Sequence, residues 1–173
     1  MLILIRGAGD IASGIAIRLY RSGFDVIMTD TARPTAIRRM VSFSGAIVAG
    51  SQTVEDVTAR LANTPEDALN ITKQGDIAVL ADEKCDCLRT LSPNALVDAI
   101  LAKRNLGTRI DMAPAVIGVG PGFTAGEDCH AVVETMRGHT LGRVYYSGSA
   151  LHNTAVPGLI GGYAGERVLR APA

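Results

Sequence analysis

Residues 1–30 read MLILIRGAGDIASGIAIRLYRSGFDVIMTD and follow the pattern of a strand, a glycine turn, a helix and a second strand. Leu2–Ile5 is a short apolar run of the kind found in strands buried on both faces of a parallel sheet. Apolar residues then recur at helical spacing as far as Ser22-Gly23, where the glycine suits the left-handed end of a helix. A second apolar run, Phe24–Met28, closes at Asp30. This order predicts a Rossmann-like, doubly wound α/β sheet that is mostly parallel.

The turn itself matches the pattern G-x-G-x-x-(G/A), and its residues in order are Gly7, Ala8, Gly9, Asp10, Ile11 and Ala12. Gly7 permits the tight turn, Gly9 lets a pyrophosphate approach the backbone, and Ala12 keeps the helix close to the strand. The free N–H groups of the first helical turn and the helix dipole both favour an anion at this point. We therefore expect all six residues to contact a phosphate-bearing small molecule.

Two residues after the second strand suggest how the rest of a nucleotide is held. Asp30 lies about 20 residues after the glycine turn, where an acidic side chain can accept hydrogen bonds from a ribose. Arg33 follows closely and could accept a 2′-phosphate. The segment Thr35–Met40 is expected to be helical, with Arg39 on its solvent-facing side.

Arg6 and Asp10 depart from the usual Rossmann pattern. Arg6 stands where the strand normally has a small or apolar residue, and Asp10 stands where an anionic phosphate should bind. Two interpretations are open. Either Arg6 pairs with Asp10 and neutralises it, or Arg6 is itself a phosphate ligand.

The middle of the chain continues the alternation of strands and helices. Val54–Leu61 alternates like a strand, although a helix is also compatible with it. Thr64-Pro65 is a good helix start, and that helix should end at Gly75. Asp76–Ala81 and Ala95–Leu101 are predicted to be further strands of the parallel sheet.

A second glycine-rich loop, GVGPGFTAG at residues 118–126, follows a predicted strand at Ala115–Val119. It lacks the lysine of a Walker A loop and is therefore not a P-loop. In open α/β sheets the ligand lies past the carboxyl ends of strands, so this loop is a candidate second contact. The alternative is an irregular surface loop. The residues expected to contact the ligand here are Gly120, Gly122, Phe123, Thr124 and Arg137.

The last third of the chain has a different, glycine-rich pattern. Further strands are predicted at Cys129–Glu134, Arg143–Ser147 and Glu166–Leu169. We divide the chain into a Rossmann-like nucleotide-binding part at residues 1–105 and a glycine-rich part at residues 106–173, packed together as one compact domain.

Composition excludes several classes of function. Acidic and basic residues balance at 17 each, and aromatic residues make up 4% of the chain, so neither a nucleic acid nor a membrane surface is expected as a partner. The apolar N-terminal run lacks the features of a signal peptide, and an odd number of cysteines argues against a disulfide framework. We expect a soluble, cytoplasmic protein that forms a homo-oligomer.

No metal site is expected. Zinc sites normally use a C-x₂-C pair together with a second pair of ligands, whereas this chain has Cys85-Asp86-Cys87 and Cys129. The three histidines, His130, His139 and His152, are not spaced as ligands on one element.

Several stretches together resemble the selenium-dependent molybdenum hydroxylase system proteins of YqeB type. The resemblance spans residues 6–172 and is carried by RGAGDIASGIAIRLYRSGFDV, VDAILAKRNLGT, DMAPAVIGVGPGFTAG, VVETMRGHTLGRV and PGLIGGYAGERVLRAPA. The family is distantly similar to the Rossmann half of the XdhC-like accessory proteins. The Cys85-Asp86-Cys87 segment is not part of the shared pattern.

The resemblance implies an accessory role in the maturation of a molybdenum hydroxylase, with that apoenzyme as partner and a molybdopterin-type dinucleotide as ligand. It leaves open whether any reaction is catalysed. It also implies that a small β-rich domain follows residue 172 in many members. Two alternatives remain, and both are compatible with the glycine turn. One is an NAD(P)-dependent oxidoreductase with His130 or Asp111 as the proton-transfer group, and the other is a non-catalytic nucleotide-binding scaffold.

Overall fold

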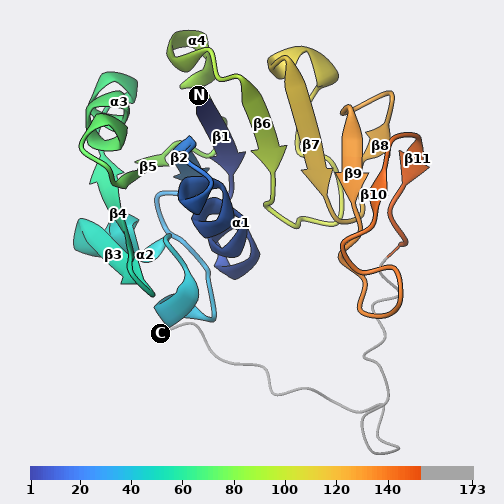
Figure 1. Ribbon diagram of the computed structural model, residues 1–173, viewed down its shortest axis with the longest axis horizontal. Helices are drawn as coiled ribbons and strands as arrows, with labels where there is room; N and C mark the ends of the chain where they lie inside the picture. The colour runs from blue at the N-terminus through green and yellow to red at the C-terminus, as the bar shows by residue number, and fades with distance from the viewer. Residues whose placement is uncertain (153–173) are drawn as a thin grey trace, which may run out of the picture.

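A computed structural model describes residues 1–152 and shows a mixed α/β fold built on a nine-stranded sheet (Figure 1). The pairs β3–β4 and β9–β10 are antiparallel, and the other neighbours in this sheet are parallel. From one edge to the other, the strands are β10 (Val144–Tyr145), β9 (Ala131–Val133), β7 (Ala115–Val119), β6 (Ala95–Asp98), β1 (Leu2–Arg6), β2 (Asp25–Asp30), β5 (Ile77–Ala81), β4 (Val57–Ala62) and β3 (Ser51–Val54).

Helices cover both faces of the sheet. On one face α1 (Asp10–Arg21) and α2 (Gly45–Ala49) pack over Ile3 and Ile5. On the other face α3 (Pro65–Lys73) and α4 (Leu88–Leu91) pack on the side that contains Leu4. Successive side chains of β1 thus enter opposite cores, which explains why its sequence is a continuous apolar run.

The order of the strands places a crevice beside β1. The chain leaves β1 through α1 and adds β2 on one side, whereas β6 pairs with β1 on the other side. In open α/β sheets ligands bind at such a reversal, past the carboxyl ends of the strands. The arrangement is compatible with a Rossmann-like fold. The strand order differs from that of a sheet in which each new strand is added at the edge. β4 precedes β5 in the chain but lies farther from β2, and the connection through α3 places β5 between β2 and β4.

The segment between β2 and β5 contains the largest differences from the sequence-based expectations. Thr35–Met40 is not a helix, and a single 3₁₀ turn at Arg39–Val41 follows the irregular stretch after Pro34. The short helix α2 was not predicted. The stretch Val54–Leu61 spans two strands, because the chain reverses at Glu55, whose φ of +55° is left-handed, and forms the β3–β4 hairpin.

The strand predicted at Ala95–Leu101 is also shorter than expected. β6 ends at Asp98, which pairs in register with Arg6. Leu101 then adopts a φ of +60°, which is incompatible with a strand.

The C-terminal strands extend the same sheet at one edge (Figure 1). β9 and β10 are shorter than the predicted strands Cys129–Glu134 and Arg143–Ser147. A separate two-stranded sheet is made by β8 (Thr124–Ala125) and β11 (Gly148–Ser149), and a 3₁₀ turn at Ile110–Met112 precedes β7. The strand predicted at Glu166–Leu169 lies outside the described residues. Among the helices of residues 1–152, none is both long enough and apolar enough to cross a membrane.

Glu134 connects the end of β9 to the residues that follow β11. Its side chain is 1% exposed and accepts hydrogen bonds from the amides of Thr135 and Met136, at 2.8 Å each, and of Leu151, at 2.9 Å. Burial alone would raise the pKa of this carboxyl group, but the three amide donors outweigh it and hold the pKa below the ordinary value of 4.5.

We predict that Glu134→Gln lowers the free energy of unfolding by about 1 to 3 kcal/mol at pH 7, because the amide nitrogen of glutamine cannot accept the hydrogen bond from Leu151. A carboxyl group with a depressed pKa stabilises the fold above its unfolded-state pKa, and this contribution disappears as the pH falls through the folded-state pKa. In urea denaturation, the difference in free energy of unfolding between the unmodified chain and Glu134→Gln should therefore become smaller below about pH 4. A difference that stays constant down to pH 3 would contradict the stabilising role of the Glu134 carboxylate.

Candidate functional site

The glycine turn after β1 has the geometry that its sequence requires. Gly7 has a φ of +99°, and a Cβ there would lie 2.9 Å from the carbonyl oxygen of Ala99. Gly9 is different, since its φ of −69° suits any residue and a Cβ would meet no atom of the described chain within 4 Å. The fold therefore explains glycine at position 7. A close-approaching ligand would explain it at position 9.

The first turn of α1 has no side-chain cap in the described chain. The N-cap residue is Gly9, which has no side chain, and the carboxylate of Asp10, the first residue of the helix, pairs instead with Arg38 at 2.6 Å. The contrast with α3 is direct. There Thr64 Oγ1 accepts a hydrogen bond from the Asp67 amide at 3.1 Å, and Asp67 in turn accepts one from the Asn63 amide at 2.9 Å.

Asp30 supports the turn from the end of β2. Its carboxylate accepts hydrogen bonds from the amides of Ala8, at 2.9 Å, and Thr31, at 2.7 Å. The sequence suggested that this side chain accepts ribose hydroxyls. In the structure the Asp30 carboxylate instead stabilises the glycine turn. A carboxylate has further lone pairs, which could accept hydrogen bonds from a ligand.

Arg6 does not pair with Asp10, so the first of the two interpretations left open by the sequence is wrong. Its side chain is 5% exposed and donates from Nη1 to Asp98 Oδ2 at 3.2 Å. The hydroxyl of Thr108 completes the group, accepting from Arg6 Nη1 and donating to Asp98. Burial of both charges is costly, so a pairing of this quality is needed to hold them. The Nε of Arg6 is buried without a hydrogen-bond partner in the described structure.

A cleft of about 800 Å³ lies at the carboxyl ends of β1, β2 and β6. The uncapped turn Gly9–Ala12 forms its centre, with Asp30, Thr31 and Arg33 on one side and Ala99–Leu101 on the other. Its charged lining residues comprise three basic and three acidic side chains: Arg6, Arg33, Lys84, Asp10, Asp30 and Glu83. Two of these acids already have partners. Asp10 forms an ion pair with Arg38, and Asp30 accepts hydrogen bonds from backbone amides.

The second glycine loop does not line this cleft. Phe123 is 4% exposed, and its ring lies so close to Gly118 that a Cβ on that glycine would be 2.5 Å from it. A Cβ on Gly122, whose φ is +109°, would lie 2.6 Å from the backbone of Arg104. These glycines are therefore explained by packing within the chain.

The other residues predicted in this loop also lie elsewhere. Thr124 bonds to Asp128 and Ser149, and Arg137 is exposed in the loop between β9 and β10. Of these residues Gly120 lies nearest to the cleft, because a Cβ there would contact Leu101, which lines the cleft. The loop thus packs against a residue of the cleft wall without lining the cleft itself.

Sequence reasoning did not single out Glu83 and Lys84, which line the cleft. It also did not single out Asp98 and Thr108, which are buried and hold the side chain of Arg6. A signal for Asp98 was present, since a charged residue at the end of one buried strand requires a charged partner on a neighbouring strand. The candidate proton-transfer groups lie outside the cleft lining. His130 Nδ1 accepts from the Val116 amide at 3.0 Å, and Asp111 pairs with Arg109 at 3.0 Å.

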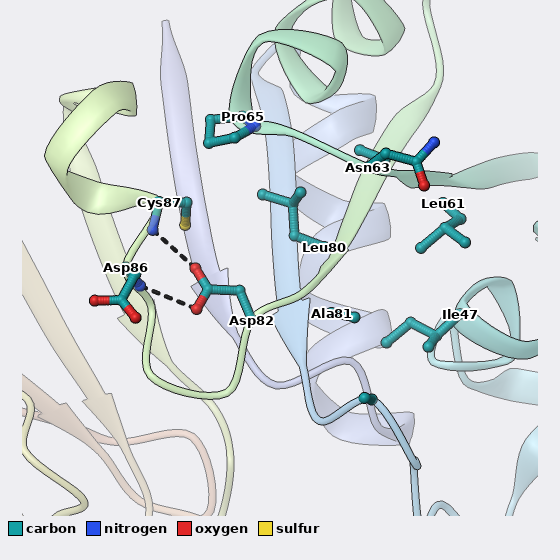
Figure 2. Close-up of a pocket in the computed structure, with 11 residues that line it drawn as sticks. Ile47, Leu61, Asn63, Pro65, Leu80, Ala81, Asp82, Asp86 and Cys87 are labelled. Atoms are coloured by element: carbon teal, nitrogen blue, oxygen red, sulfur yellow. Dashed lines mark hydrogen bonds between the residues drawn. The ribbon is translucent and has the colours of Figure 1, made fainter.

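A smaller cavity of about 440 Å³ lies past the carboxyl ends of β4 and β5 (Figure 2). Most of its lining is apolar, and Asp82 stands at one side with its carboxylate directed at two backbone amides. Within residues 1–152, no three His, Cys, Asp or Glu residues are grouped so that they could hold a metal ion.

Comparison with known proteins gives one relative with a curated sequence. The chain is 59% identical over 172 residues to "Uncharacterized protein YqeB" of Escherichia coli (strain K12). The match covers 99% of this chain and 32% of the relative, so the chain spans about a third of that protein's length. No family model matches the chain. No solved structure matches it either.

We predict strong coupling between Arg6 and Asp98. Arg6→Met or Asp98→Leu alone should each cost about 3–5 kcal/mol, because the partner remains as an uncompensated buried charge. The double variant removes both charges and should be less destabilised than the sum of the single variants. Urea denaturation of the four proteins measures this directly. Additive losses would show that the pair is not coupled.

Proposed function

We propose that this chain binds a phosphate-bearing nucleotide or a molybdopterin-type dinucleotide in the cleft, and that it serves as an accessory protein in the maturation of a molybdenum hydroxylase. The binding proposal is supported by the cleft and by the uncapped first turn of α1. The accessory role, and the hydroxylase apoenzyme as partner, are supported by the family resemblance of the sequence.

The observation that carries the proposal is the contrast between α1 and α3. The chain supplies its own cap to α3, with Thr64 and Asp67 accepting backbone N–H groups. Within residues 1–152 no side chain caps α1, and the N–H groups of its first turn and the positive end of the helix dipole face the cleft. A phosphate group would satisfy these donors.

The rest of the cleft suits an elongated ligand. With a pyrophosphate over Gly9–Ala12, one end extends toward Asp30 and Arg33 and the other toward Ala99–Leu101. The cleft volume of about 800 Å³ is within the range of small-molecule sites. NAD(P) and a molybdopterin dinucleotide share the pyrophosphate that this geometry would recognise. Which of the two ligands binds more tightly would therefore depend on the contacts that the groups at the two ends of the ligand make with the cleft.

The binding test measures the melting temperature of the chain with NAD(H), NADP(H), CTP and a molybdopterin dinucleotide. A ligand present at 100 times its dissociation constant should stabilise the fold by about 2.7 kcal/mol. The proposal predicts the largest shift with the molybdopterin dinucleotide. A response to NADPH alone would favour an oxidoreductase, and no response to any nucleotide would favour a scaffold.

We predict that Gly9→Asp abolishes this response without weakening the fold. The backbone at position 9 accepts any residue, and aspartate is a good N-cap, so its carboxylate would occupy the same amides that the phosphate needs. Gly14→Asp is the matched control, because this exposed glycine lies in the second turn of α1, and among the described residues no atom apart from the neighbouring helix backbone lies within 4 Å of where its Cβ would be.

The expected result is an unchanged or higher melting temperature for the unliganded Gly9→Asp variant, with no shift on adding ligand. Gly14→Asp should retain the shift of the unmodified chain. Equal ligand shifts in both variants would contradict the proposed position of the phosphate.

A further inference from the structure

The strand β3 forms one edge of the nine-stranded sheet, and within residues 1–152 no other strand pairs with its outer side (Figure 1). Its four residues, Ser51–Val54, pair one to one with β4 without a bulge. An unpaired edge offers backbone N–H and C=O groups to a strand of another chain, and proteins commonly protect it with charged side chains, proline or a bulge. β3 has none of these three, so its outer side is open to a further strand.

The register of the β3–β4 pair determines which backbone groups point outward. The Leu61 amide donates to the Gly50 carbonyl oxygen at 2.8 Å, and hydrogen-bonded and non-bonded pairs alternate from that point along the hairpin. Gln52 therefore directs its N–H and C=O groups toward β4, whereas Ser51 and Thr53 direct theirs away from the sheet. One of these outward groups has a contact within the chain, because the exposed Gln52 side chain donates to the Thr53 carbonyl oxygen at 3.2 Å.

The chain around this edge is uncharged. No charged residue occurs between Arg39 and Glu55, a stretch of the sequence that contains α2 and all of β3. The two acids of the turn that follows, Glu55 and Asp56, both pair with Arg21 of the same chain. A second copy of this surface would therefore meet little like-charge repulsion, and a partner of opposite charge would gain little here.

An exposed apolar side chain lies beside the same edge. α2 packs on β3, and its Val48 is 79% exposed. The opposite edge of the sheet differs, because β10 has two residues and directly follows the exposed Arg143. A short edge strand with a basic neighbour is protected against pairing with its own copy. Of the two edges, β3 is the one suited to self-association.

We propose that β3 pairs with β3 of a second copy of this chain, so that the two sheets join in a homodimer. The pairing is antiparallel, because a two-fold axis makes the same edge complementary to itself. An axis beside Gln52 places Ser51 of each copy opposite Thr53 of the other, and their outward N–H and C=O groups bond to each other. This axis is perpendicular to the sheet, so both α2 helices lie on one face, with Val48 of each copy beside the new pair of strands. The dimer does not depend on the identity of the cleft ligand.

The test measures the molar mass of the chain by light scattering during size-exclusion chromatography at micromolar concentration. We expect twice the 18.1 kDa of the single chain. Thr53→Lys puts a lysine from each copy into the interface and should reduce the mass to that of the single chain. Thr90→Lys is the matched control, because Thr90 is an exposed threonine on α4, distant from β3 in Figure 1, and this variant should remain a dimer.

Amide hydrogen exchange of the unmodified chain locates the contact without any variant. The Ser51 and Thr53 amides should be protected in the dimer, and the Ser51 amide should lose its protection in Thr53→Lys. Melting temperatures establish that both variants are folded. The proposal is overturned by a monomeric unmodified chain, by a dimer that persists in Thr53→Lys, or by a dimer in which the Ser51 and Thr53 amides exchange as fast as those of exposed loops.

Discussion

The buried ion pair between Arg6 and Asp98 fixes the geometry on which the candidate site depends. It joins the ends of β1 and β6, the two strands at which the sheet reverses its direction of growth. Immediately after it the Ala99 amide donates to the Arg6 carbonyl oxygen at 2.8 Å, and the Ala99 carbonyl oxygen fills the space that a side chain at Gly7 would need. The buried ion pair thereby lies directly beside the contacts that position the turn at Gly7, which lines the cleft.

The charges around the cleft are arranged so that an anion could enter. Asp10 would repel a phosphate at the start of α1, but Arg38 neutralises it. Asp30 has its carboxylate turned to the Ala8 and Thr31 amides. In the described chain no side chain caps the amides of the first turn of α1, and Arg6, which is paired with Asp98, lines the same cleft. The repulsion suggested by the sequence is thus compensated by neighbouring groups.

The parts of the fold that local sequence determines were predictable. The strand, glycine turn and helix at residues 2–21 follow from periodicity and from the needs of the turn, and α3 follows from its Thr64-Pro65 start. The charge of Arg6 at the end of a buried strand signalled that an acidic partner was needed, but local sequence could not identify that partner, because Asp98 and Thr108 are about a hundred residues away along the chain. The second glycine loop was misjudged for a related reason. Glycine permits close approach, and at Gly118 and Gly122 the approaching groups are Phe123 and the backbone of Arg104.

The central claim is that the first amides of α1 bind a phosphate group. The most direct measurement follows the ¹H–¹⁵N amide signals of Asp10, Ile11 and Ala12 while pyrophosphate or ADP is added. The account predicts saturable downfield shifts at these three amides, with the capped first turn of α3 nearly unchanged. Signals that stay fixed at α1, or that move equally at both helices, would contradict it.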